Sequence, residues 1–293
     1  MPELPEVETI RRQLEPELIG RRIEAMEVLD ARLTRPEDPR TVERACAGRR
    51  IEAVERRGKY LMLRLDGDRR LVMHLRMTGN VVLGDAGGDV RFLRAIIRME
   101  GGRVVRFTDA RRFGTAVVLD DDDLEEYMAL RAGVEPLTEA LTAERIGELA
   151  AGRRAPLKSF LLMQSGIAGL GNIYADEALW RARLHPLSPA GSMRPEHWER
   201  LRAGIVGALE AGLDNGGASI DDYRDARGAE GSMQDEFCVH TREGLPCHRC
   251  GTEIRRIVAG GRSTYFCPGC QQRLRRRPRR RGTRRRSRVS AGR

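Results

Sequence analysis

The sequence is poor in long apolar runs, in aromatic side chains and in lysine. Aromatic residues occupy 4% of its 293 positions, and no run of about 18 apolar residues occurs, which argues against a membrane-spanning helix. The acidic start, with proline at positions 2 and 5, lacks the basic and apolar segments of a secretory signal. We therefore expect a cytoplasmic protein without a membrane partner, long enough for two sizeable domains and one small module.

The scarcity of lysine draws attention to the two lysines that are present. Of 53 basic residues, only Lys59 and Lys158 are lysines. Arginine effectively never loses its proton in a protein, whereas lysine can. Each lysine is therefore a candidate for proton transfer, with chance retention as the alternative.

The net charge of +10 is unevenly distributed. Twelve arginines and no acidic residue lie between positions 273 and 293, so the remaining 41 basic residues are balanced by 43 acidic ones. We predict that residues 273–293 form a disordered tail that adds salt-sensitive phosphate affinity. A solvated tail without a role is the alternative.

Hydrophobic periodicity divides the rest of the chain into two parts. Between residues 50 and 120, alternating β-branched segments separated by glycines predict an antiparallel sandwich or barrel, and residues 7–19 ahead of them have the spacing of a helix. From about residue 124 to 212 the apolar spacing becomes helical. Residues 217–234 are polar and predict a mobile loop. The fold class is therefore α+β and multidomain.

Four of the six cysteines form two closely spaced pairs near the C-terminus. Cys247 and Cys250, then Cys267 and Cys270, have the spacing of one structural zinc site, with Gly251 and Gly269 allowing the tight turns. Four cysteine ligands leave no open position for catalytic water, and we expect no organic cofactor. The residues between the pairs predict a β-hairpin whose glycine turn presents Arg262, for which a solvated turn arginine is the alternative. Cys46 and Cys238 are interpreted as packing residues.

A glycine-rich turn precedes a predicted helix that starts near Asn172. Free amides and the positive end of the helix dipole make such a turn an anion site, with phosphate as the expected anion. Asn172 acting only as a helix N-cap is the alternative.

The N-terminal residues suggest covalent chemistry. Removal of Met1 would leave Pro2 with a secondary amine that titrates near about 7.7–8.0, and attack of this amine on a sugar C1′ gives an iminium. Glu3 and Glu6 fall in the same helical turn, within reach of the same sugar. The alternative is an acidic helix start with no catalytic role.

Six segments, in this order, resemble the formamidopyrimidine-DNA glycosylase family over residues 2–272. They are residues 2–9, 57–60, 74–77, 108–114 and 169–177 and the four-cysteine finger. The resemblance implies an N-terminal β-sandwich with its helix (1–134), a helix–two-turn–helix domain (135–236) and a zinc-finger hairpin (237–272), followed by the tail (273–293). It implies a monomeric base-excision-repair enzyme, both a DNA-formamidopyrimidine glycosylase and a DNA-(apurinic or apyrimidinic site) lyase, whose partner is damaged double-stranded DNA.

The resemblance also implies roles for individual residues. Pro2 would form the Schiff base, Glu3 would protonate the opening sugar, Glu6 would assist, and Lys59 would donate a proton or contact phosphate during β-elimination. Arg262 would assist δ-elimination and hold phosphate, and a base flipped out of the stack leaves a gap that must be filled. The implied DNA contacts are His74, Met77, Arg111, Phe113, Arg153 and Asn172, with Met77, Arg111 and Phe113 filling the gap. Ser219 and Asp222 lie in the segment implied to close on the lesion.

Some positions depart from the family pattern. A histidine-containing strand usually precedes the Asp-x-Arg-x-Phe motif and contacts DNA, whereas here the stretch is residues 89–94, where Arg91 or Arg94 could compensate. His240 stands where tyrosine is common. Two other functions remain open: an endonuclease VIII-type enzyme for oxidised pyrimidines, whose N-terminal motif usually has glycine at the position of Leu4, and a non-enzymatic zinc-containing DNA-binding protein of the same fold.

Overall fold

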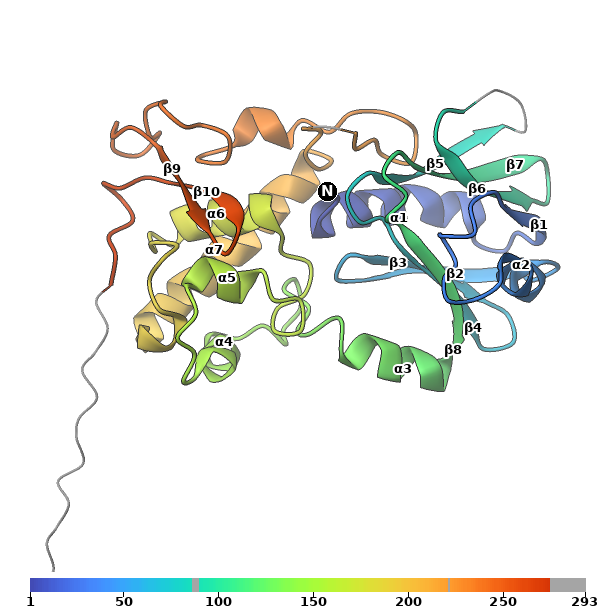
Figure 1. The fold of residues 1–293 in the computed structure, drawn as a ribbon, viewed down its shortest axis with the longest axis horizontal. Helices are drawn as coiled ribbons and strands as arrows, with labels where there is room; N and C mark the ends of the chain where they lie inside the picture. The colour runs from blue at the N-terminus through green and yellow to red at the C-terminus, as the bar shows by residue number, and fades with distance from the viewer. Residues whose placement is uncertain (86–89, 221, 275–293) are drawn as a thin grey trace, which may run out of the picture.

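The computed structural model describes residues 1–85, 90–220 and 222–274. Figure 1 shows two lobes, one built from two β-sheets and the other from helices with a small hairpin. Helix α1 (Leu4–Leu18) lies in the sheet lobe, and its N-terminal end points toward the helical lobe. The helix begins three residues earlier than the predicted position 7, because Pro5 is tolerated in a first turn and Glu6 accepts a hydrogen bond from the Glu3 amide. Pro2 therefore lies at the tip of a helix, as predicted.

The sheet lobe is an antiparallel sandwich. One sheet has the order β1 (Ile23–Val28), β6 (Leu93–Met99), β7 (Arg103–Asp109), β5 (Gly79–Asp85). The other has the order β2 (Ile51–Arg57), β3 (Tyr60–Leu65), β4 (Arg69–His74), β8 (Thr115–Asp120). Leu14 of α1, Leu63 and Phe107 share one buried core between the sheets. Helix α2 (Pro39–Cys46) covers an edge, and Cys46 is buried in the same core, as a packing residue should be.

At one end of the first sheet, three loops lie side by side in strand order. Gly79 at the start of β5 pairs with Asp109 at the end of β7, and Leu93 at the start of β6 pairs with Thr108. The segments before β6, after β7 and before β5 therefore form a row. Neighbouring strands lie about 4.8 Å apart, so the outer two loops are separated by about 10 Å.

The helical lobe has its own core. It is built from α4 (Ala143–Ala150), α5 (Leu157–Leu161), α6 (Asn172–Arg181) and α7 (Pro195–Asp214). Helix α3 (Asp121–Ala129) instead packs on the second sheet, where Leu124 and Met128 share a small core with Tyr60, Met62 and Val72. Short 3₁₀ turns occur at Ala190–Ser192 and Met233–Glu236. Leu4 of α1 is buried in this core with Tyr174 and Ile205, so α1 connects the two lobes. The domain boundaries at 134/135 and 236/237 stay predictions.

The C-terminal module is the predicted hairpin. Strands β9 (Arg255–Ala259) and β10 (Arg262–Phe266) are antiparallel and are joined by Gly260 and Gly261, whose φ values are +58° and +75°. Positive φ values explain the two glycines, since other residues rarely adopt them. Most of the predicted tail, residues 275–293, lies outside the described residues. In the described part of the chain, no helix is both long and apolar enough to cross a membrane.

Candidate active site

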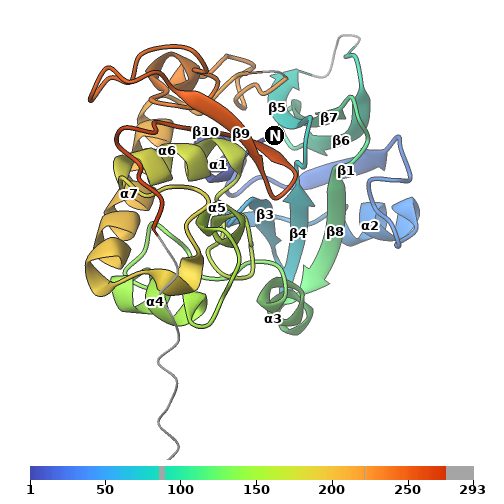
Figure 2. The ribbon, with the colours of Figure 1, turned by 60° about the vertical axis from the view of Figure 1, so that its left-hand side comes forward.

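A pocket of about 230 Å³ lies where the two lobes and the hairpin meet. In Figure 2 the β9–β10 hairpin extends toward the N-terminus of the chain. The pocket brings together residues that are far apart in sequence, including five of the predicted site residues. Those five are Glu3, Met77, Asn172, Asp222 and Arg262, and the other lining residues are Met1, Ile173, Ala218, Ile220, Tyr223, His240 and Thr241.

The Glu3 carboxylate is held by the first turn of α6. It accepts hydrogen bonds from the backbone amides of Gly171 at 2.5 Å, Ile173 at 3.0 Å and Tyr174 at 3.4 Å, and Glu3 is 1% exposed. A Cβ at position 171 would approach the Glu3 carboxyl carbon to 2.4 Å, so only glycine fits there. Three amides of the predicted anion-binding turn therefore hold an internal carboxylate, and phosphate binding at Asn172 stays a prediction. The sequence did not reveal this because residues 3 and 171 meet only through tertiary packing.

Glu6 lies behind Glu3 and is fully enclosed. One carboxylate oxygen accepts hydrogen bonds from the Tyr174 hydroxyl at 2.7 Å and the Ala218 amide at 2.8 Å, and the other accepts one from the Glu3 amide at 2.7 Å. Burial, and then the negative charge of Glu3, raise the pKa of Glu6 above its ordinary value. Glu6 thus holds the Glu3 backbone amide and, through the Ala218 amide, connects the start of α1 to the segment that follows α7.

Pro2 is buried beside these carboxylates, and Met1 lies at the pocket wall. While Met1 is present, the Pro2 nitrogen belongs to a peptide bond and has no nucleophilic lone pair. Loss of Met1 would free the amine and also vacate space in the pocket.

Lys59 and His74 belong to the second sheet and do not line the pocket, but Lys59 is close enough to Glu3, Glu6 and Arg262 for their charges to act on it. Lys59 directly precedes β3 and is 5% exposed. Burial lowers the pKa of Lys59, while the charges of Glu3 and Glu6 oppose that shift. His74 ends β4 opposite Tyr60, and its Nδ1 accepts a hydrogen bond from the Arg76 amide at 2.9 Å. Burial and the charges of Arg76 and Lys59 lower the pKa of His74 to about 3, so this imidazole is neutral at physiological pH.

Asn172 is the first residue of α6, and Gly171 is the N-cap, which rules out a cap role for Asn172. Its side-chain amide donates to the Ser263 carbonyl of β10 at 3.0 Å. The side-chain oxygen of Asn172 is buried and has no partner among the described residues. Asn172 therefore links the helix to the hairpin and brings Arg262, the first residue of β10, to the pocket.

The predicted gap-filling residues lie at the end of the first sheet. Met77 lines the pocket, and the Arg111 guanidinium lies 4.9 Å from the ring centre of Phe113, which is 52% exposed. The Thr78 hydroxyl accepts a hydrogen bond from the Arg111 amide at 3.1 Å and itself bonds to Asp109. This bond ties the loop after β7 to the Met77 segment.

The segment predicted to close on the lesion divides into two parts. Ser219 does not line the pocket: its hydroxyl donates to the Tyr223 carbonyl at 3.0 Å and accepts from the Gly231 amide at 3.0 Å, which shapes the loop. Ile220 and Asp222 line the pocket, and the Asp222 carbonyl accepts a hydrogen bond from the Asn80 side chain at 2.8 Å.

Lys158 is enclosed in the helical lobe with no exposed surface. Its ammonium lies 2.5 Å from Asp176, whose other oxygen is 3.0 Å from His240 Nδ1. His240 lines the pocket, so the buried series of contacts from Lys158 through Asp176 to His240 reaches the pocket wall. The sequence had marked Lys158 by its rarity but contained no local signal for its partners. Arg153 is exposed between α4 and α5, where its Nε donates to the Leu149 carbonyl at 2.6 Å.

The four cysteines form a site for one metal ion. Their sulfur atoms all lie within 4.8 Å of one another, close to the separation of about 3.8 Å that a tetrahedron of Zn–S bonds near 2.3 Å requires. Gly251 has a φ of +73°, as the predicted tight turn demands. The Trp180 indole donates to Cys247 Sγ at 3.3 Å, so α6 also contacts the metal module. Thiolate ligands in this geometry fit zinc, which would hold the hairpin in place.

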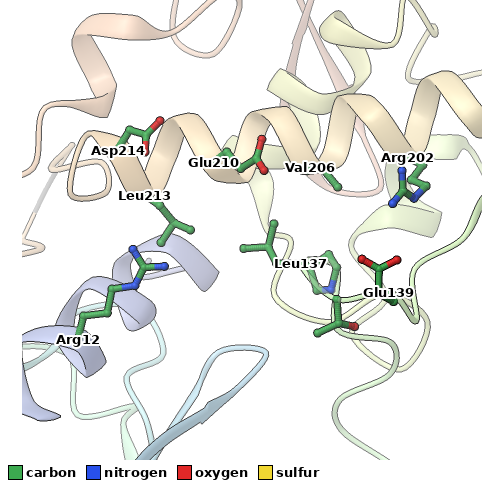
Figure 3. A pocket seen from close by; sticks show the side chains of 10 residues that line it. Arg12, Leu137, Glu139, Arg202, Val206, Glu210, Leu213 and Asp214 are labelled. Atoms are coloured by element: carbon green, nitrogen blue, oxygen red, sulfur yellow. The ribbon is translucent and has the colours of Figure 1, made fainter.

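A larger cavity of about 420 Å³ lies away from these residues, between α1, residues 136–139 and α7. Figure 3 shows Arg12 and Arg202 facing it together with Glu139, Glu210 and Asp214. None of the predicted site residues lines it. Volume alone therefore does not identify the functional pocket.

Three family models match the chain in the order of its structural parts. They are the formamidopyrimidine-DNA glycosylase N-terminal domain at residues 1–116, its H2TH domain at residues 132–224, and a zinc finger found in FPG and IleRS at residues 244–273. The fold and the site thus define a DNA glycosylase with a helix–two-turn–helix domain and a zinc finger.

Curated relatives and solved structures agree with this class. The formamidopyrimidine-DNA glycosylases of Chloroflexus aurantiacus and Roseiflexus sp. are 44% and 43% identical, over 92% and 93% of this chain and 98% and 100% of theirs. A variant of the Lactococcus lactis enzyme in complex with Fapy-dG containing DNA is 35% identical, with a TM-score of 0.86 over 93% of this chain and 100% of that one. The chain belongs to the formamidopyrimidine-DNA glycosylase family.

Proposed function

We propose that this chain excises oxidised purines from duplex DNA through an iminium at Pro2 and then cleaves the abasic strand by β,δ-elimination. The observation that carries the proposal is the cluster at the tip of α1, where buried Pro2 lies beside two enclosed carboxylates and the low-pKa Lys59. The Lactococcus lactis relative has been solved with DNA containing Fapy-dG and with DNA containing an abasic site, the substrates of these two steps.

Excision begins with attack of the Pro2 amine on C1′ of the lesion nucleotide. The N–C1′ bond forms as the glycosidic bond breaks, and the base leaves with the bonding electrons. The nitrogen lone pair then forms the iminium as the C1′–O4′ bond opens, and O4′ requires a proton. Glu3 takes the proton that the amine releases and passes it to O4′. Its position is set by the three amides of α6.

Strand cleavage uses the iminium as an electron sink. Removal of a C2′ proton expels the 3′ phosphate, and a second elimination expels the 5′ phosphate. Lys59 donates a proton or contacts phosphate in the first elimination, and its lowered pKa makes the ammonium a better proton donor. Arg262 assists the second elimination and holds phosphate opposite Asn172.

Base excision from a duplex requires the damaged nucleotide to leave the stack. Met77, at the pocket wall, and the exposed Arg111 and Phe113 pair fill the vacated space. Arg111 reads the orphaned cytosine, while the apolar side chains separate the neighbouring base pairs. His74 and Arg153 contact the DNA backbone, and Ile220 and Asp222 cover the flipped base. The zinc finger keeps Arg262 at the site.

Borohydride trapping tests the proposal. Protein without Met1 is incubated with duplexes that carry 8-oxoguanine opposite cytosine, an oxidised pyrimidine, or no lesion, and the covalent product is measured. We expect a covalent product with 8-oxoguanine and none with the undamaged duplex. Trapping with the pyrimidine alone would favour the endonuclease VIII-type function. The absence of a product with every lesion would contradict the enzyme function and favour a non-enzymatic DNA-binding protein. Pro2→Gly and a form that retains Met1 are the matched controls, and both should lose efficient trapping.

A further inference from the structure

Arg56, Glu8 and Glu135 form a part-buried group of charges, the Arg56 cluster, that the proposed mechanism does not use. The Arg56 Nε donates to Glu8 at 3.0 Å, and one terminal nitrogen of the guanidinium donates to Glu135 at 2.9 Å. The side chains of Arg56, Glu8 and Glu135 are 10%, 12% and 20% exposed. Desolvation offsets much of the attraction in a buried ion pair, so stability alone does not account for the cluster.

The two carboxylates of the Arg56 cluster belong to different parts of the molecule. Glu8 is in the second turn of α1, the helix whose tip carries Pro2. Glu135 directly follows Val134, which pairs with Ile167 of the helical lobe. The guanidinium between the two carboxylates therefore joins the helix of the nucleophile to the segment that enters the helical lobe.

The Arg56 cluster also holds the turn that carries Lys59. Gly58 and Lys59 alone connect β2 to β3. The remaining terminal nitrogen of Arg56 donates to the Gly58 carbonyl at 3.0 Å, and the Gly58 amide donates to the second carboxylate oxygen of Glu135. Both backbone polar groups of Gly58 are thus held by the cluster, which fixes the orientation of the peptide unit directly before Lys59.

Gly58 also packs against the residues that hold the tip of α1. Its φ is +57°, and a Cβ at this position would lie 3.1 Å from the Ala168 Cβ. The Leu4 amide donates to the carbonyl of Gly169, the next residue, at 3.0 Å. The Lys59 turn and the first turn of α1 therefore rest on adjacent residues, and a rotation of the Lys59 turn would move its ammonium relative to the helix tip.

We propose that Arg56 is a positioning residue for strand cleavage, which holds the Lys59 turn in place relative to Pro2. This inference rests on the proposed function, in which both groups act on one deoxyribose. Proton delivery requires an approach of hydrogen-bond length, so a displaced turn slows the elimination. Base excision depends on the turn less, because Glu3 is held separately by the α6 amides.

Strand cleavage at a preformed abasic site measures the positioning effect separately from base excision. Glu135→Asp keeps the charge but shortens the side chain, so one carboxylate no longer reaches both Gly58 and Arg56. Arg56→Lys also keeps the charge but loses the planar fork that serves three acceptors. For both variants we expect single-turnover cleavage to fall about tenfold, while excision of 8-oxoguanine, measured after alkaline scission, stays within about twofold of the wild type. Unchanged cleavage in both variants would overturn the proposal.

A double variant separates positioning from a general loss of structure. In protein that carries Lys59→Met, Glu135→Asp should slow cleavage no further, because effects of residues that act through one another are not additive. A second loss as large as the first would give Glu135 a role that does not pass through Lys59, against the proposal. Arg98→Lys, in an exposed ion pair between β6 and β1, is the matched control and should cleave like the wild type.

The scarcity of lysine allows a second measurement that does not depend on activity. Protein labelled isotopically at the ε-carbon of lysine gives two NMR signals, from Lys59 and Lys158, and Lys59→Met assigns them. Burial lowers the pKa of Lys59, so a looser and more exposed turn in Glu135→Asp should raise this pKa toward 10.5. The titration of Lys158 should stay as in the wild type.

The groups that face Lys59 are the same in Glu135→Asp as in the wild type. They are Glu3 and Glu6 at the start of α1, Arg262 of β10, and His74 of β4. A change in the Lys59 pKa therefore reports exposure of the turn, and an unchanged pKa would show that the turn has not moved and would refute the positioning role. A wild type that cleaves no abasic DNA contradicts the proposed function alone, and the titration still decides whether the Arg56 cluster positions Lys59.

Discussion

The buried carboxylates at the tip of α1 and the exposed loops at the end of the first sheet are built in opposite ways. Glu3 and Glu6 are each 1% exposed, and backbone amides and a tyrosine hydroxyl satisfy their oxygens. Phe92 and Phe113 are about half exposed, and the backbone in their loops is strained. Proton transfer requires groups fixed before the substrate arrives, whereas distortion of DNA requires apolar surface that remains free until DNA covers it.

Glu3→Gln should show the largest effect in the buried region. The amide keeps the shape of the carboxylate but cannot relay the proton, and it brings a donor toward the α6 amides, so we expect kcat to fall about 10³-fold. Single-turnover excision of 8-oxoguanine measures this loss. DNA affinity should change little, and Glu24→Gln on the exposed face of β1 is the control. An equal loss of affinity and rate would contradict the assignment of catalysis to the buried carboxylates and of DNA binding to the exposed loops.

Lys59→Met should lower strand cleavage about 100-fold and at the same time stabilise the fold. The folded-state pKa of Lys59 is lowered, so between that pKa and 10.5 the unfolded chain binds more protons than the folded protein. The free energy of unfolding of the wild type therefore increases as the pH rises through this window. Below the window, the cost of burying the charged Lys59 ammonium destabilises the wild type in full. Urea unfolding at pH 7.5 and pH 10 measures the difference, which we expect to be larger at pH 7.5. A less stable Lys59→Met at pH 7.5 would contradict this sign.

Asp176→Asn tests how much the buried ion pair between Lys158 and Asp176 contributes to the stability of the fold. Removal of one partner leaves an unpaired buried charge, which typically costs about 3–5 kcal/mol. Urea unfolding should show a loss of this order, and the double variant Lys158→Met with Asp176→Leu should recover most of it. Additive losses in the double variant would mean that the pair does not act as a unit.

Phe113→Ala should have the smallest effect on chemistry. We expect Kd for the abasic-analogue duplex to rise about tenfold, because stacking on one base contributes about 1–3 kcal/mol. If the exposed loops bind the ground state and the transition state equally well, their loss weakens DNA binding without slowing the reaction. At saturating DNA, the single-turnover excision rate should therefore stay within about threefold of the wild type. A loss of rate as large as that of Glu3→Gln would remove the distinction between the regions.

The sequence predicted those parts of the site whose residues are close along the chain. The paired cysteines and glycines specified the metal site and the hairpin turn, and the alternating and helical periods located the sheet and helical lobes. Pro2 at the tip of α1 followed from the same local pattern. The contact of Glu3 with the α6 turn did not follow from the sequence, because Glu3 is 168 residues away from Gly171, and phosphate binding at Asn172 stays a prediction.

Sequence alone thus determined the elements, the metal ligands and the family, since each depends on residue type and local spacing. Tertiary structure decided the partners of Glu3, Glu6 and Lys158, and it placed Phe92 beside the loops that carry Met77 and Phe113. The physical reason is that burial, hydrogen bonding and charge act between residues that are adjacent in space, and only the packing of two lobes around α1 makes these residues neighbours.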